Sequence, residues 1–276
     1  MNHPAIGKTI VAAGLKTNYH EMGSGRPVIL LHGSGMGVSG WENWRRVMPD
    51  LAKRHRILAP DIVGFGFTER PAEAQYNIKF WVQHLTGFIE ALGLEKPVLI
   101  GNSFGGSLAL AYAARQSDKL AGMVLMGTPA GDFTRTSGSS AWYYEPSLEN
   151  MGALLREFPY DKSIVDDEMI ASRHEVTMMA GGLDAYRALF PEPGPAGEQR
   201  TVRGLPPATL EQVSTPVLAL HGREDKMIPL ECSLRIVEHV PNAELHVFGK
   251  CGHWVQIERK DAFVEQTLNF IARLAA

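Results

Sequence analysis

Cysteine is scarce in this 276-residue chain, which contains only Cys232 and Cys251. Two cysteines are too few for the disulfide framework of a small secreted protein, so we interpret both as free thiols in a reducing compartment. The first residues, Met1–Ala5, lack the charged and apolar segments of a signal peptide. We therefore expect the protein to be cytoplasmic.

Long apolar runs and an excess of positive charge are also absent. Runs such as Val28–Leu31 fall far short of the ~20 residues that cross a membrane. With 27 Lys and Arg against 30 Asp and Glu, the net charge is −3, which excludes a basic footprint for nucleic acid or anionic membranes. No H-E-x-x-H, C-x-x-C or EF-hand motif occurs, so no metal is predicted.

What the chain does contain is an alternation of short apolar runs with helix-length segments. The predicted strands are Val28–His32, Arg56–Asp61, Pro97–Asn102, Gly122–Gly127, Pro216–Gly222 and Ala243–Gly249. The predicted helices are Trp41–Lys53, Ile78–Leu92, Ser107–Arg115, Leu230–Val240 and Ala262–Leu274. Near-continuous Val, Ile and Leu runs are typical of strands buried on both faces, so the pattern predicts a doubly wound α/β domain with a mostly parallel sheet. Lys8–Ala12 and Leu15–Glu21 are predicted to form an N-terminal hairpin at its edge.

The alternation stops between Asp132 and Pro207, where no strand-like run is found. This segment begins with the Ser, Thr and Gly stretch Thr134–Ser140 and ends with the proline-rich stretches Pro191–Pro195 and Pro206–Pro207. We interpret it as a helical insertion, or cap. The predicted organisation is an α/β core of residues 1–131 and 208–276 with a cap of residues 132–207.

The run GNSFG at Gly101–Gly105 matches the nucleophile motif G-x-S-x-G. A buried strand is predicted directly before it and a helix directly after it. A serine on such a strand-to-helix turn is exposed at the carboxyl edge of the sheet, where the helix N-terminus adds positive potential. We therefore predict that Ser103 is a nucleophile; the alternative is a glycine-rich turn with a solvated serine.

Two further polar residues follow predicted strands in the order typical of this architecture, Ser then Asp then His. Asp225 lies in the loop after Pro216–Gly222, and Glu224 is its local competitor. His253 lies in the loop after Ala243–Gly249. Taken singly, each could be an ordinary surface residue, but all lie at the same edge of the sheet. The predicted catalytic residues are Ser103, Asp225 and His253.

A serine hydrolase also needs donors for the developing oxyanion. One is predicted to be the backbone N–H of Phe104, which directly follows the nucleophile. The other is assigned to Ser34 in the glycine-rich loop HGSGMG at His32–Gly37, whose backbone can approach a ligand closely. A dinucleotide or phosphate loop is the rival interpretation, but neither G-x-G-x-x-G nor a Walker lysine is present. His32 is interpreted as structural.

One segment of the predicted cap, Asp166–Val176, has acidic residues at its start and apolar residues at helical spacing. Arg173 falls on the same face as the apolar Ile170 and Val176. An arginine in an apolar stripe requires an anion, which is either a bound carboxylate or an Asp or Glu of the cap. Arg187 is a second, weaker candidate for the same role.

The sequence also resembles a known family, the meta-cleavage product hydrolases, and most closely the 2-hydroxymuconate semialdehyde hydrolases. The motifs that carry this resemblance are Gly101–Gly106, Ala59–Thr68, His221–Asp225 and Gly252–Trp254. It covers nearly the whole chain, and it implies an α/β-hydrolase fold with an eight-stranded, mostly parallel sheet and an inserted helical cap. Met36 stands where the family usually has proline, and residues 194–207 differ from the usual end of the cap.

The resemblance implies an enzyme that uses no cofactor and cleaves a carbon–carbon bond in 2-hydroxy-6-oxo-dienoates, the ring-fission products of aromatic degradation. The residues implied to line the substrate site are Ser34, Asn43, Asn102, Arg173 and Trp254. The expected partner is a small carboxylate substrate, and a homodimer or larger homo-oligomer is plausible. A carboxylesterase with the same triad is the alternative activity, and a non-catalytic ligand-binding relative is the alternative of another class.

Overall fold

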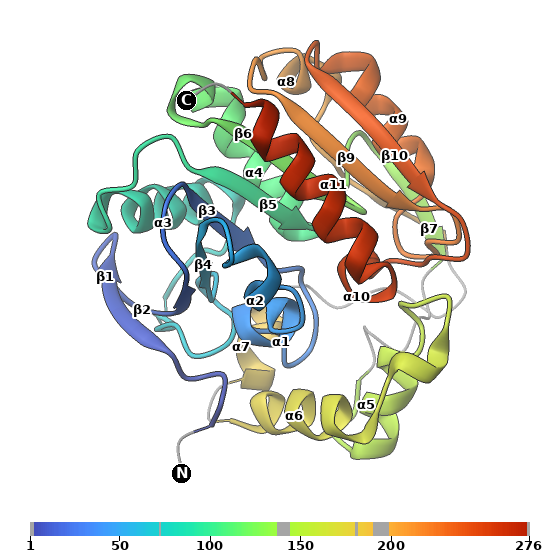
Figure 1. The fold of residues 1–276 in the computed structure, drawn as a ribbon. Helices are drawn as coiled ribbons and strands as arrows, with labels where there is room; N and C mark the ends of the chain where they lie inside the picture. Colours follow the sequence, from blue (N-terminus) through green and yellow to red (C-terminus); the bar gives the residue numbers. More distant parts are fainter. Residues whose placement is uncertain (1–2, 72, 137–143, 180–181, 190–198, 275–276) are drawn as a thin grey trace.

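An eight-stranded sheet with the strand order β1-β2-β4-β3-β5-β6-β9-β10 forms the centre of the molecule (Figure 1). The computed structural model describes residues 3–71, 73–136, 144–179, 182–189 and 199–274. The strands of this sheet are β1 (Lys8–Ala12), β2 (Leu15–Met22), β3 (Pro27–Leu31), β4 (Arg56–Pro60), β5 (Val98–Asn102), β6 (Gly122–Met126), β9 (Val217–Gly222) and β10 (Ala243–Phe248). The predicted α/β-hydrolase sheet is confirmed.

Strand directions divide the sheet into two parts. β1 and β2 form an antiparallel hairpin, and β2 runs antiparallel to β4. All pairings from β4 through β3, β5, β6 and β9 to β10 are parallel. The inner strands β5, β6 and β9 are buried along their whole length, as their apolar runs predict. β10 differs, because it is the edge strand and Val247 is 38% exposed.

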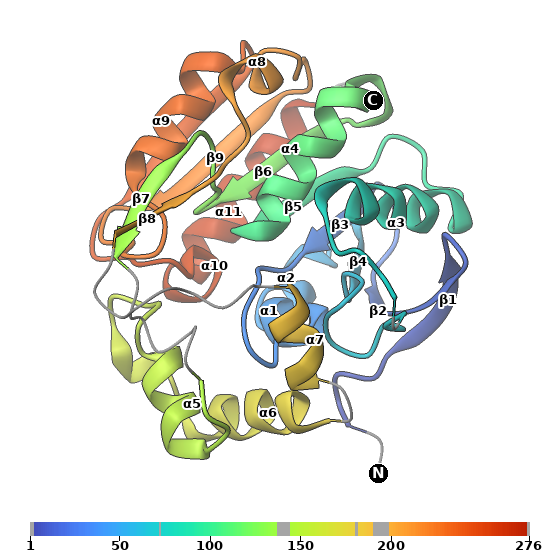
Figure 2. The same ribbon diagram turned by 180° about the vertical axis from the view of Figure 1, so that it is seen from behind.

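Helices cover both faces of the sheet (Figures 1 and 2). One face carries α3 (Ile78–Ala91), α4 (Phe104–Gln116) and α9 (Leu230–His239), and the other carries α1 (Gly40–Trp44), α2 (Met48–Leu51) and α11 (Lys260–Arg273). Successive residues of β3 separate the two cores, since Ile29 belongs to the first and Leu30 to the second. Shorter helices are η1 (Ser117–Lys119), η2 (Lys162–Ile164), α8 (Pro207–Leu210) and α10 (Val255–Glu258). Within the described residues, no helix combines the length and the apolarity needed to cross a membrane.

Two of the predicted helices differ from the structure by more than two residues at one end. The segment Trp41–Lys53, predicted as one helix, is the pair α1 and α2. The break lies before Pro49, which has no N–H to donate and whose ring would clash with the carbonyl of Arg45 in a continuous helix. Helix α4 begins at Phe104, earlier than the predicted Ser107, so the nucleophile turn leads directly into its first turn.

Between β6 and β9 the chain leaves the sheet and forms the helices α5 (Leu148–Leu155), α6 (Asp167–Met178) and α7 (Gly182–Leu189). These lie together at one end of the sheet (Figures 1 and 2). The same segment contains an antiparallel ladder of β7 (Phe133–Thr136) and β8 (Gln199–Val202), so the expectation of a strand-free insertion is wrong. Both strands are short and mostly polar, and the apolar pattern of a buried strand is therefore missing. Pro191–Pro195, and parts of the stretches 134–140 and 194–207, lie outside the described residues.

The cap helices bury a small apolar core of their own. Its buried members are Met36, Tyr144, Met151, Leu154, Leu155, Val165, Met169, Ile170, Tyr186 and Trp254. Met36 and Trp254 come from loops at the carboxyl edge of the sheet, so this core joins the cap to that edge. The space between cap and sheet edge is where the predicted site residues meet.

Candidate active site

Ser103 lies on a tight turn between β5 and α4, with φ +53° and ψ −115°. A non-glycine residue in this region costs about 1–3 kcal/mol and persists only where its surroundings enforce it. The surroundings here are closely packed backbone, since a Cβ on Gly101 would lie 2.5 Å from the nitrogen of Gly106 and one on Gly105 would lie 2.2 Å from the oxygen of Leu31. The flanking glycines therefore allow the turn that presents Ser103 at the sheet edge.

His253 and Asp225 form a buried hydrogen-bonded pair. The His253 Nδ1–H donates to Asp225 Oδ2 at 2.7 Å. Asp225 Oδ1 accepts from the backbone N–H groups of Met227 at 2.7 Å and Ile228 at 3.0 Å. Burial alone would raise the pKa of Asp225, but the charge and hydrogen bond of His253 outweigh it and leave the pKa below its ordinary value. The carboxylate therefore stays ionised and orients the imidazole.

The neighbouring carboxylate, Glu224, points elsewhere. It accepts from Arg223 at 2.8 Å and from the backbone N–H of Cys251 at 3.0 Å. The structure thus brings Asp225, and not its competitor, into contact with the histidine. Cys251 is buried, and burial raises the pKa of its thiol to about 12, so it is a packing residue and not a second nucleophile.

Ser34 and Phe104, the residues predicted to supply the oxyanion donors, line the same cavity as Ser103. Phe104 is the first residue of α4, so its N–H has no acceptor within the helix. Ser34 belongs to the loop after β3, and the side chain of His32 stabilises this loop by hydrogen bonds. His32 Nδ1–H donates to the oxygen of Gly33 at 2.7 Å, and Nε2 accepts from the N–H of Ile62 at 2.9 Å. Burial lowers the pKa of His32 to about 4, so it remains neutral and can keep both bonds.

A cavity of about 460 Å³ lies between the sheet edge and the cap. The predicted site residues that line it are Ser34, Asn43, Asn102, Ser103, Phe104, Arg173, His253 and Trp254. Asp225 is not at its surface and lies behind His253. Arg187 is exposed on α7 and does not line the cavity. Among the described residues, no three His, Cys, Asp or Glu side chains converge to hold a metal ion.

Three residues that line this cavity each have a buried side-chain nitrogen without a hydrogen-bond partner within the described part of the chain: Asn43 Nδ2, Asn102 Nδ2 and Arg173 Nε. Arg173 is 5% exposed, and its Nη1 donates to the oxygen of Met36 at 3.4 Å. Burial lowers the pKa of its guanidinium, against the opposing charge of Glu42. Of the two anions considered for Arg173, an Asp or Glu paired directly with it is not found among the described residues. The three donors can therefore hold a ligand rich in acceptors.

The sequence prediction missed Phe158, a cap residue that lines the cavity. Its ring stacks on Trp254 with the centroids 5.0 Å apart and the planes at 4°, and its oxygen accepts from the N–H of His253 at 2.9 Å. It lies three residues beyond the end of α5, so no helical pattern identifies it as a cavity residue. The cavity residues Phe133, Val202, Leu205, Met227 and Ile228, also missed, form an apolar wall.

Met36, the departure from the family pattern, also has a defined place. Its side chain is 5% exposed and belongs to the apolar core of the cap. Its carbonyl is the acceptor for Arg173. The residue therefore connects the loop that contains Ser34 to the cap helix that contains Arg173.

Comparison with known proteins agrees with this geometry. Residues 26–260 match the family model described as the alpha/beta hydrolase fold. The chain is 45% identical to the 2-hydroxymuconate semialdehyde hydrolase of Pseudomonas sp. strain CF600, over 100% of this chain and 97% of that protein. It is 44% identical to the 2-hydroxy-6-oxo-2,4-heptadienoate hydrolase of Pseudomonas putida strain F1, over 97% and 96% of the two chains.

Among solved structures, the meta-cleavage product hydrolase CumD of Pseudomonas fluorescens IP01, complexed with acetates, superposes with a TM-score of 0.89. It is 44% identical in sequence, and the match covers 97% of this chain and 98% of that one. The sequence motifs, the fold and the relatives thus agree. The chain belongs to the meta-cleavage product hydrolases of the α/β-hydrolase fold family.

Proposed function

We propose that this protein hydrolyses a carbon–carbon bond in 2-hydroxy-6-oxo-dienoates, the compound class in the names of its relatives. The observation that carries the proposal is the set of buried, unpartnered donors on Arg173, Asn43 and Asn102 in the cavity that contains Ser103. A buried donor without an acceptor costs about 1–3 kcal/mol, so a ligand that supplies acceptors there is favoured. A carboxylate with an adjacent enol or keto oxygen supplies them.

The remainder of the cavity supports the same class of ligand. Its wall of Phe133, Met227 and Ile228 suits the uncharged part of a conjugated chain. With the carboxylate at Arg173, the C6 carbonyl is directed toward Ser103. The substituent on C6 then extends along the apolar wall.

The mechanism assigns one role to each group. Ketonisation of the dienol first creates an electron sink, because the carbon–carbon bond cannot break while the leaving carbon would be an unstabilised carbanion. His253, oriented by Asp225, then takes the proton of Ser103, which attacks C6 while the amides of Ser34 and Phe104 hold the oxyanion. Collapse breaks the C5–C6 bond, and the expelled dienolate takes the proton from His253 to become the 2-hydroxydienoate. Water then hydrolyses the acyl-serine and releases the second acid.

In a variant of this route, Ser103 acts as the base on a water molecule that attacks C6. The two routes differ in whether Ser103 becomes acylated. Rapid quenching with mass spectrometry of the intact protein distinguishes them, because an acyl-enzyme adds the mass of the acyl group to the chain.

The organisation proposed for this function is an α/β core of residues 1–131 and 208–276 that carries the triad, with a cap of residues 132–207 that carries Arg173. We also propose that the protein is cytoplasmic and forms a homodimer or larger homo-oligomer. Light scattering on the eluting peak of a gel-filtration column tests this assembly, and a mass equal to one chain of 30.3 kDa would contradict it.

The decisive experiment offers the purified protein two kinds of substrate. One is the coloured ring-fission dienols, whose loss is followed by absorbance, and the other is neutral nitrophenyl esters. We expect rapid loss of the dienols and slower release of nitrophenol. Fast ester turnover with no loss of dienol would establish the alternative, a carboxylesterase. A Ser103→Ala variant is expected to bind dienol without turnover. Continued turnover by this variant would show that bond cleavage does not use Ser103.

A further inference from the structure

Glu42 on α1 is a buried carboxylate that the proposed mechanism does not use. Ser39 and Glu42 have the S-x-x-E spacing of a capping box, in which the glutamate returns a hydrogen bond to the N–H of the serine. Half of the box is formed, since Ser39 Oγ accepts from the N–H of Glu42 at 3.1 Å. The Glu42 carboxylate instead accepts at Oε1 from Ser172 Oγ on α6, at 2.8 Å. The carboxylate is therefore directed at the cap.

The second oxygen of this carboxylate has a cation only at the outer limit of an ion pair and accepts no hydrogen bond among the described residues. Glu42 Oε2 is buried and has no hydrogen-bond partner among the residues that the structure describes. Arg45 Nε lies 4.0 Å from it, but the Nη1 of Arg45 donates to Glu168 at 2.6 Å. The Glu42 side chain is only 1% exposed, so water does not screen its charge well. A carboxylate in this setting is costly unless it faces a cation.

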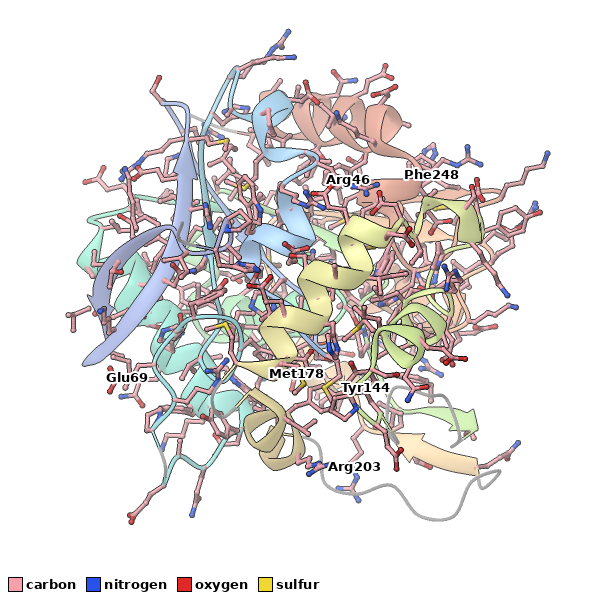
Figure 3. All side chains as sticks on the ribbon, turned by 90° about the horizontal axis from the view of Figure 1, so that it is seen from below. Arg46, Glu69, Tyr144, Met178, Arg203 and Phe248 are labelled. Atoms are coloured by element: carbon pink, nitrogen blue, oxygen red, sulfur yellow. The ribbon has the colours of Figure 1, made fainter. Side chains whose placement is uncertain are left out.

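A second cation, Arg173, directly follows Ser172, the α6 residue that donates to Glu42. The charge of Glu42 raises the pKa of the Arg173 guanidinium and opposes the effect of burial. The backbones around this pair are close together, because a Cβ on Gly37 would lie 2.0 Å from the oxygen of Arg173. α6 is also bound to the core at its start, where Arg46, which is labelled beside this end of the helix in Figure 3, donates to Asp166 at 2.9 Å. The two charges are thus held in a fixed relation.

We propose that Glu42 is the resident counter-charge of Arg173 and weakens the binding of the substrate carboxylate. In the ligand-free protein, the field of Glu42 offsets part of the cost of the buried guanidinium. A bound carboxylate takes over this role and is repelled by Glu42. The 2-hydroxydienoate product keeps the same carboxylate, so Glu42 also promotes its release. Glu42 acts only through Arg173 and is a positioning residue, and the proposal rests on the function proposed above.

Glu42→Gln tests this, because it keeps the shape and the acceptor for Ser172 but removes the charge. The Kd of a 2-hydroxy-6-oxo-dienoate is measured by dienol absorbance in a Ser103→Ala background. We expect the Kd to fall about tenfold or more, because a like charge within about 12 Å of the bound carboxylate has at least this effect at an effective dielectric constant near 20. The Tm of the ligand-free protein should fall at the same time. A merely structural role would instead weaken both stability and binding.

Two controls isolate the charge of Glu42. Glu168→Gln removes a carboxylate from the same α1–α6 contact, but that carboxylate is 73% exposed and pairs with Arg45, so the Kd should stay within about twofold. Ser172→Ala removes the hydrogen bond and keeps the charge, and it too should leave the Kd nearly unchanged. If Glu42→Gln does not fold, Glu42→Met removes the charge with a flexible apolar side chain and must show the same tightening.

An unchanged or higher dienoate Kd in Glu42→Gln would overturn the proposal. Equal tightening for a neutral nitrophenyl ester, measured as KM in the background with Ser103 intact, would also overturn it, because that result would reflect a general change of the cavity. These outcomes are separate from the test of function. Absence of dienol turnover by the wild-type protein refutes the proposed reaction, whereas normal turnover with an unchanged Kd in Glu42→Gln refutes only the counter-charge.

Discussion

Replacing Asp225 with Asn should disable the histidine by forcing the wrong tautomer. Asp225 Oδ1 accepts two backbone N–H groups, from Met227 and Ile228, so the oxygen of the new amide must take that place. The amide NH₂ then points at His253 Nδ1, where the carboxylate oxygen now lies at 2.7 Å. His253 must accept at Nδ1 and carry its proton on Nε2. In that form it cannot take the proton of Ser103.

The size of the loss in kcat follows from the catalytic groups that Asp225→Asn leaves in place. The cavity and the oxyanion donors are untouched, because Asp225 lies behind His253 and does not line the cavity. We expect kcat to fall about 10³- to 10⁴-fold, which corresponds to about 4–5.5 kcal/mol of lost transition-state stabilisation. The KM for the dienoate should change less than about threefold, since the ligand contacts persist.

Steady-state kinetics on the dienol substrate measure both constants, and circular dichroism confirms that the variant is folded. Glu224→Gln is the matched control, since it changes the adjacent carboxylate, whose partners are Arg223 and the N–H of Cys251. Its kcat should remain within about threefold of wild type. The reasoning is refuted if Asp225→Asn keeps more than about a tenth of the wild-type kcat, or if Glu224→Gln loses as much.

Three further predictions concern substrate binding, pH and backbone packing. Arg173→Gln should raise the KM for carboxylate-bearing dienols about 100-fold and leave neutral esters almost unchanged, and an equal loss on both would indicate a purely structural arginine. Burial lowers the pKa of His84 from 6.5 to about 4, so between these two pH values the folded protein binds fewer protons than the unfolded chain. The free energy of unfolding therefore decreases as the pH falls through this range. Urea unfolding at pH 7 and pH 5 should show this loss reduced by about 2 kcal/mol in His84→Gln, and a loss as steep as in wild type would contradict the assignment. Gly105→Ala should prevent folding or lower the Tm by more than about 10 °C, because its Cβ would lie 2.2 Å from the oxygen of Leu31. Gly93→Ala is the control, because its Cβ meets no atom within 4 Å and the φ of +58° should lower the free energy of unfolding by only about 1 kcal/mol.

Features encoded over short stretches of the chain were predictable. The apolar runs of β5, β6 and β9 identify strands buried on both faces, and the structure confirms them. The glycines around Ser103 are required by backbone contacts within and beside the same turn, so the motif alone predicts its position. In contrast, the ladder of β7 and β8 carries no apolar signal, because its short polar strands are stabilised mainly by pairing with each other.

The choice between neighbouring carboxylates needed tertiary contacts. Asp225 and Glu224 are adjacent in one loop, and composition hardly separates them. The backbone N–H groups that follow Asp225 and the N–H of Cys251, far along the chain, direct the two side chains to different partners. Phe158 was missed because it lies beyond the end of α5, where no local pattern predicts which residues it contacts.

The sequence by itself determined the α/β class, the strand-to-helix turn of Ser103 and the family, because each depends on residues close together in the chain. Only the tertiary structure decided which partner Arg173 has. Spacing on α6 leaves open a direct ion pair with the cap or a bound carboxylate, and the structure places Arg173 at the cavity without a carboxylate paired directly to it among the described residues. That arrangement depends on α1 and α6, which are more than a hundred residues apart in sequence, and no local pattern encodes the distance between them.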